Sequence, residues 1–161
     1  RGWLAQGYPV SSLLEVPESG TDMDVEPQTA DFIELEELQR IYRDPGVQLW
    51  DTRGPGEFSG EERTDNLRRG HIPGALNLDW YQLLTTASRE GEPRFFKPVA
   101  ELEQLLATLG LRRDKTIITY CQSGNRATIG NLVLELLGYP QHRLYDASMG
   151  EWANLPETPL L

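Results

Sequence analysis

The sequence predicts an α/β fold, with an open parallel sheet of about five strands and helices on both faces. From about Phe32 onward, short β-rich runs alternate with helical patterns, an order that produces a parallel sheet. The run Thr116–Tyr120 is apolar and β-branched without clean alternation, which is typical of a central strand covered on both faces. With 161 residues, the chain suffices for one domain with a substantial core and is too short for two of ordinary size.

The first half of the pattern begins at Phe32-Ile33, which we expect to form a short strand. Residues 34–43 predict a helix, because apolar side chains recur on one face and acidic residues gather near its positive N-terminal end. Residues 47–50 and 75–78 predict two further strands. A short helix is expected near residues 80–84. The Gly54-Pro55-Gly56 run predicts a turn between these elements, and the polar stretch 60–70 an exposed loop.

The second half contains the two clearest helices. Residues 99–109 place apolar side chains on one face and end at Gly110, a residue type common just after helices. Residues 127–137 form the strongest helical pattern, and Leu144-Tyr145 predicts the last strand. The apolar residues of this second helix recur at the spacing of one face, which we expect to be buried: Ile129, Leu132, Val133, Leu136 and Leu137.

Three regions differ in composition. Residues 11–31 mix proline, serine, glycine and acidic residues without a hydrophobic period, so we interpret them as a linker. Residues 32–161 are expected to form the folded domain. Residues 1–10 are apolar and are typical of part of a folded unit. The chain begins at Arg1 without a methionine, so we expect it to be a fragment, a processed product or an engineered piece of a protein.

The formal net charge of −10 argues against nucleic acid or an anionic membrane as the main partner, because both require a basic surface. No apolar run has the length of a membrane span. We therefore expect a chain that is neither nucleic-acid-binding nor membrane-bound, and a cytoplasmic location. Any anionic substrate must be attracted locally, against the overall charge.

The chain has one cysteine, Cys121, which excludes an intrachain disulfide and a zinc site with several cysteine ligands. Its two histidines, His71 and His142, lack the spacing of metal ligands, so we expect no metal and no cofactor. A lone cysteine is usually a buried apolar residue. Cys121 therefore needs further evidence before a chemical role can be assigned to it.

That evidence is its position, directly after the strand Thr116–Tyr120 and just before a helix. Ligands bind at this edge of open α/β sheets. A short loop that enters a helix points backbone N–H groups inward, and the helix N-terminus and Arg126 add positive charge. All three favour a thiolate over a thiol and would hold a persulfide anion. Gly124 and Asn125 are residue types that tolerate the positive φ that a tight cradle requires.

Four segments together resemble the rhodanese family over about residues 32–159. The run 121–126, Cys-Gln-Ser-Gly-Asn-Arg, is similar to the family's active-site loop, and 51–53, Asp-Thr-Arg, to its Asp-x-Arg motif. The most specific match is 70–75, Gly-His-Ile-Pro-Gly-Ala. The run 145–152, Tyr-Asp-Ala-Ser-Met-Gly-Glu-Trp, resembles the closing segment of tandem members, with Ala147 in place of a common glycine.

The resemblance implies a sulfurtransferase. Cys121 would take a sulfane sulfur from an anionic donor such as thiosulfate or 3-mercaptopyruvate and pass it to cyanide or a thiol. The backbone amides of residues 122–126 (Gln122, Ser123, Gly124, Asn125 and Arg126) would line the cradle. Arg53 would bind the donor, or alternatively pair with Asp51 or Glu57. The neutral Gln122 and Ser123 depart from both thiosulfate-type and mercaptopyruvate-type loops, which leaves the donor open. Residues 1–10 resemble the end of an upstream rhodanese domain, or alternatively form an arm that packs on this domain.

Two other functions compete with this interpretation. Cysteine phosphatases of the same fold have five residues between Cys and Arg, whereas Gln122–Asn125 provide four, which suits a single sulfur better than a phosphate. A non-catalytic recognition module is the second rival, because fold does not guarantee activity. We expect His71, Pro73 and Gly74 to be structural, setting a tight turn. Met149 and Trp152 are expected in the core or the pocket wall.

Overall fold

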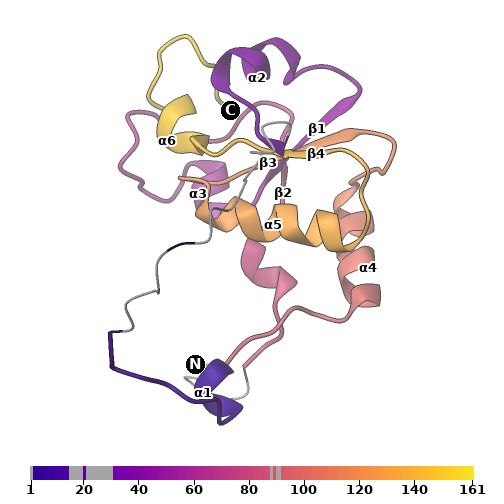
Figure 1. Ribbon diagram of the computed structural model, residues 1–161. Helices are drawn as coiled ribbons and strands as arrows, with labels where there is room; N and C mark the ends of the chain where they lie inside the picture. Colours follow the sequence, from indigo (N-terminus) through magenta and orange to yellow (C-terminus); the bar gives the residue numbers. More distant parts are fainter. Residues whose placement is uncertain (1, 15–19, 21–30, 88, 90–91) are drawn as a thin grey trace.

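The computed structural model describes residues 2–14, 20, 31–87, 89 and 92–161. Its centre is a parallel sheet of four strands in the order β2-β1-β3-β4 (Figure 1). The strands are β1 (Val47–Asp51), β2 (Leu76–Asn77), β3 (Thr116–Tyr120) and β4 (His142–Leu144). The predicted α/β class and the central place of β3 are therefore confirmed.

The sheet has four strands where about five were expected. Phe32, predicted to begin a strand, makes only an isolated parallel bridge to Leu144. The N–H of Ile33 donates to the carbonyl of Leu144 at 3.0 Å, and the chain then enters a helix at Leu35. Because the helix begins two residues after this bond, the pairing cannot extend into a fifth strand.

Helices cover both faces of the sheet, as predicted (Figure 1). Residues of α2 (Leu35–Ile41) and α6 (Ser148–Trp152) pack in the same core as Leu49 and Ile118. On the other face, α4 (Val99–Leu109), α5 (Asn125–Leu136) and the 3-10 helix Trp80–Leu83 pack with Trp50 and Ile117. Neighbouring residues of β1 and β3 thus supply opposite cores, which is why β3 shows no alternation in sequence.

The buried face of α5 agrees only in part with the prediction: Val133 and Leu137 are buried and Ile129 packs against the core, as expected. Leu132 and Leu136 are 45% and 62% exposed, while Ala127, Gly130, Val133 and Leu134 are buried. A Cβ on Gly130 would lie 3.1 Å from Thr52 and 3.3 Å from Trp50. The helix therefore turns a side rich in small residues toward the sheet, because the large indole of Trp50 already fills the space.

Three short helices were not predicted. Helix α3 (Pro55–Ser59) occupies the stretch expected to be a turn, with Pro55 at its first position, where a missing N–H costs nothing. Helix α6 lies in the closing segment, residues 145–156. Helix α1 (Gly2–Ala5) lies away from the sheet, and Gly2 is beside the stretch 92–95 (Figure 1). Most of the predicted linker lies outside the described residues.

Candidate functional site

The candidate site is the loop of residues 121–126, called the cysteine loop below, at the carboxyl edge of the sheet. It begins at Cys121, the residue after β3, and leads into α5 at Asn125. Cys121 is 1% exposed and packs with Ala127 and Leu144. Strand β1 ends at the same edge, at Asp51, which pairs in register with Tyr120. The ends of two central strands therefore meet beside the thiol.

The closing segment holds the cysteine loop from one side through backbone bonds. The N–H of Met149 donates to the carbonyl of Cys121 at 3.1 Å, and that of Gly150 to the carbonyl of Gln122 at 2.8 Å. Two segments that are distant in sequence are thus joined residue by residue. The position of the thiol depends on the start of α6 as well as on β3.

Ser148 is the side chain that completes this contact. Its Oγ accepts hydrogen bonds from the N–H groups of Cys121 and Gly124, both at 3.1 Å, and donates to the carbonyl of Tyr145 at 2.8 Å. Ser148 is fully buried and has a φ of 55°, alone among the described non-glycine residues in being positive. A strained backbone at a buried polar residue is typical of a functional site.

Gly124 allows the loop to approach the closing segment closely. Its φ is 80°, and a Cβ there would lie 2.1 Å from Oδ1 of Asp146 and 2.9 Å from the carbonyl oxygen of Asp146. No side chain fits this space, so glycine is required on two counts. The positive φ expected at Gly124 is confirmed. The same expectation for Asn125 is wrong, because Asn125 is already the first residue of α5.

The loop amides divide into two groups. The N–H of Gly124 donates to Ser148, and that of Asn125 donates to the carbonyl of Ser123 at 3.0 Å. Within the described residues, the N–H groups of Gln122, Ser123 and Arg126 have no acceptor. Three amides, and not the five expected from residues 122–126, are therefore free to bind an anion at the start of α5.

Arg126 is held by a carboxylate. Its Nη1 and Nη2 donate to Oε2 and Oε1 of Glu57 at 2.5 and 2.8 Å. These hydrogen bonds raise the pKa of Arg126, and a smaller contribution from Cys121 acts in the same direction. In return, Arg126 lowers the pKa of the Glu57 carboxyl against the effect of burial. Both groups are charged at neutral pH.

Arg53 forms an ion pair with Asp51, which was the predicted alternative to binding the donor. It is 1% exposed, and its Nη2 donates to Oδ2 of Asp51 at 2.6 Å and to the carbonyl of Gly70 at 2.8 Å. Burial raises the pKa of the Asp51 carboxyl, and the hydrogen bonds from Arg53 act in the opposite direction. The side chain of Arg53 is enclosed in this arrangement, and its hydrogen-bond partners are Asp51 and Gly70, not residues of the cysteine loop.

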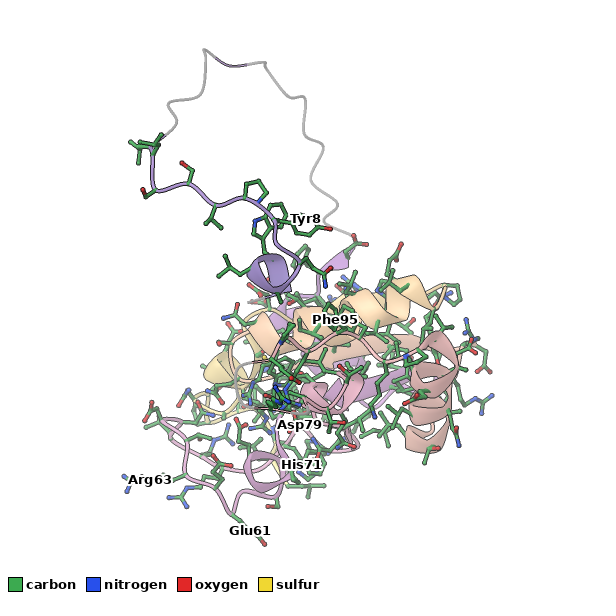
Figure 2. All side chains as sticks on the ribbon, turned by 90° about the horizontal axis from the view of Figure 1, so that it is seen from below. Tyr8, Glu61, Arg63, His71, Asp79 and Phe95 are labelled. Atoms are coloured by element: carbon green, nitrogen blue, oxygen red, sulfur yellow. The ribbon has the colours of Figure 1, made fainter. Side chains whose placement is uncertain are left out.

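The other loop side chains point away from the thiol or lie on the surface. The amide of Gln122 exchanges two hydrogen bonds with Asn66, at 2.7 and 3.1 Å, which ties the loop to residues 60–70. Ser123 and Asn125 are exposed. Figure 2 shows Glu61 and Arg63 of the 60–70 loop pointing outward, as expected of an exposed loop.

Four of the residues expected to be structural have contacts or backbone angles that fit this expectation. The ring of His71 stacks on Phe58 at 3.6 Å, and its Nδ1 lies 2.9 Å from the carbonyl oxygen of Phe58. Gly74 has a φ of 87°, which fits the predicted turn. Met149 and Trp152 are fully buried in the core.

Sequence reasoning missed three contributors to the site: Ser148, Asn66 and the pairing of Glu57 with Arg126. The motif around Ser148 was recognised. The hydrogen bonds of its hydroxyl depend on a positive φ, which cannot be predicted from a serine in the sequence. Glu57 was considered as a partner of Arg53 and not of Arg126. Arg126 lies 69 residues from Glu57, and only the folded sheet brings them together.

Among the described residues, no cluster of three or more His, Cys, Asp or Glu side chains could hold a metal ion. None of the helices in that same part of the chain is long and apolar enough to cross a membrane. What the site offers chemically is a nearly enclosed nucleophile, three free amides, and a guanidinium paired with a carboxylate.

Comparison with known proteins places this chain in a family. The family model described as Rhodanese-like domain matches residues 34–155. Thiosulfate sulfurtransferase from Azotobacter vinelandii is 34% identical over 161 residues, which cover 98% of this chain and 55% of that protein. 3-mercaptopyruvate sulfurtransferase from Escherichia coli O157:H7 is 35% identical over 152 residues, covering 91% of this chain and 51% of that protein.

The chain thus spans about half the length of these curated relatives. The solved structure of an anaerobic ergothioneine biosynthesis enzyme from Chlorobium limicola has a TM-score of 0.76 at 24% identity, covering 98% of this chain and 38% of that one, which supports the fold alone. The resemblance drawn from the motifs is confirmed, and the chain belongs to the family of rhodanese-like domains.

Proposed function

We propose that this domain is a sulfurtransferase that moves a sulfane sulfur from a small anionic donor to cyanide or a thiol through a persulfide on Cys121. The observation that carries the proposal is the single cysteine at the end of β3, followed in the cysteine loop by the amides of Gln122, Ser123 and Arg126, which have no acceptor within the described residues. The names of the relatives from Azotobacter vinelandii and Escherichia coli O157:H7 support the same reaction and suggest thiosulfate or 3-mercaptopyruvate as donor.

The chemistry proceeds in two displacements. The Cys121 thiolate attacks the outer sulfur of thiosulfate, the sulfur–sulfur bond breaks, and sulfite leaves with the electron pair. The persulfide anion that forms is held by the loop amides and by the N-terminal end of α5. The acceptor then attacks the outer sulfur, and the Cys121 thiolate leaves. Such covalent catalysis predicts ping-pong kinetics.

Incubation with thiosulfate tests the proposal directly. We expect intact mass spectrometry to show a gain of one sulfur atom, and cyanide to remove it with release of thiocyanate. A cysteine phosphatase or a binding module would show no gain in mass. If neither thiosulfate nor 3-mercaptopyruvate adds mass to the protein, the proposal is refuted. The loop of four residues between Cys121 and Arg126 favours sulfur over phosphate transfer.

Ser148 provides a prediction about the cradle. Ser148→Ala removes the acceptor for the N–H groups of Cys121 and Gly124, so we expect a loss of about 1–3 kcal/mol in stability. We also expect transfer to fall roughly tenfold, because two loop amides lose their partner. Urea denaturation and thiocyanate formation measure the two effects.

Ser148→Gly is the matched control, because it removes the same hydroxyl but tolerates the φ of 55°. It should lose as much transfer as Ser148→Ala while keeping more stability. Full transfer activity in both variants would show that the hydroxyl does not position the cysteine loop.

We also propose that residues 1–10 belong to an upstream rhodanese domain of the same chain and that residues 11–31 link it to this one. Two observations support this. Trp3, Leu4 and Tyr8 are 57%, 61% and 51% exposed, so this domain covers little of their apolar surface. The relatives are also nearly twice as long as the matched region. Tyr8 lies on a segment away from the sheet (Figure 2).

A further inference from the structure

Around the cysteine loop, negatively charged side chains balance the positively charged ones. This balance is unexpected for a site that receives anions. Arg53, Arg68 and Arg126 each contact a segment that forms the site, and each is engaged. Arg53 pairs with Asp51, and Arg126 pairs with Glu57. Arg68 donates to backbone carbonyls of the closing segment, among them those of Trp152 and Ala153.

Glu57 has the largest effect on this balance. Its side chain is 13% exposed, and its carboxylate binds both terminal nitrogens of Arg126, whose side chain is 28% exposed. Asp146 adds a second negative charge directly against Gly124. The side chains nearest the loop therefore have no excess of positive charge, and the free amides remain as the main binding groups for an anion.

We propose that Glu57 selects the sulfur donor by charge: by neutralising Arg126, it makes the pocket favour donors of low charge over the thiosulfate dianion. This inference rests on the proposed sulfurtransferase function and names the substrate class of that site. Glu57 acts through Arg126 and needs no contact with the donor. A carboxylate this close to the guanidinium cancels most of the attraction that Arg126 would exert on a second anionic charge.

Two donors that differ by one charge provide the test. Methanethiosulfonate has a methyl group where thiosulfate has one anionic oxygen, so it is a monoanion of similar size. Attack by Cys121 on its outer sulfur releases methanesulfinate with the electron pair and leaves the same persulfide. The ratio of kcat/KM for thiosulfate to that for methanethiosulfonate therefore reports the charge preference and cancels effects on the nucleophile.

Glu57→Gln keeps an oxygen that can accept from the N–H of Gly54 and removes the charge. We expect it to raise the ratio about five- to tenfold at low salt, and the gain to shrink as salt is added. Glu61→Gln is the matched control: it removes the same charge from a side chain that points outward on the neighbouring loop (Figure 2), and should change the ratio less than about twofold.

An unchanged ratio in Glu57→Gln, or an equal loss with both donors, would overturn the proposal, because Glu57 would then only position Arg126. If that variant does not fold, the salt dependence of the ratio in the wild-type protein still tests the proposal. A pocket without excess positive charge in a chain of net charge −10 predicts that added salt raises the ratio, and a fall would contradict the proposal. Failure of wild type to form a persulfide with either donor would instead refute the sulfurtransferase function.

Discussion

Cys121→Ser is expected to abolish sulfur transfer while leaving the fold intact. The hydroxyl of serine occupies nearly the same volume as the thiol, and Cys121 is enclosed with Ala127 and Leu144, which the substitution leaves in place. An alkoxide is not available at neutral pH, and an oxygen nucleophile cannot form a persulfide. We expect a fall of at least about a thousandfold, on the scale that removal of a catalytic nucleophile produces.

Thiocyanate formation from thiosulfate and cyanide measures the loss, and intact mass after thiosulfate treatment shows whether any sulfur is still bound. The urea midpoint serves as the control and should stay close to wild type. Cys121 is the only cysteine in the chain, so sulfur bound to the variant could not be attributed to another thiol. Transfer above background in Cys121→Ser would refute the assignment of the nucleophile.

Local patterns predicted the framework of the fold well. Residues 99–109 and 116–120 were expected as a helix and a strand, and both have these bounds in the structure. Each carries a complete signal of its own: a spaced apolar face that ends at Gly110, and a β-branched run between polar residues. The place of Cys121 between β3 and α5 followed from this strand signal and from the helical pattern of residues 127–137.

Features that depend on tertiary contact could not be predicted in this way. The buried side of α5 was assigned to a face that included Leu132 and Leu136, but both are exposed, and Gly130 packs against Trp50 instead. The partner of Arg53 was left open between Asp51, Glu57 and a donor, because each would satisfy a guanidinium. The structure brings Glu57 to Arg126, leaving Asp51 for Arg53.

The second large effect is expected from Gly124→Ala, which tests whether the cysteine loop needs its close contact with the closing segment. An alanine there must adopt a φ of 80° and place its Cβ 2.1 Å from Oδ1 and 2.9 Å from the carbonyl oxygen of Asp146. The side chain of Asp146 can rotate, but the carbonyl belongs to the backbone beside Ser148. The loop must therefore move, and the N–H of Gly124 must leave Ser148.

Gly138→Ala is the matched control, because Gly138 also has a positive φ, of 68°, but an added Cβ would meet no atom within 4 Å. It should cost about 1–2 kcal/mol of stability from backbone strain alone, with little change in transfer. Gly124→Ala should cost more and lower kcat/KM for transfer by about 10²-fold or more, as a displacement of about 1 Å in a catalytic group can do. Parallel urea denaturation and thiocyanate assays of the two variants separate strain from displacement. Equal transfer rates in the two would mean that the closing segment stabilises the loop without positioning Cys121.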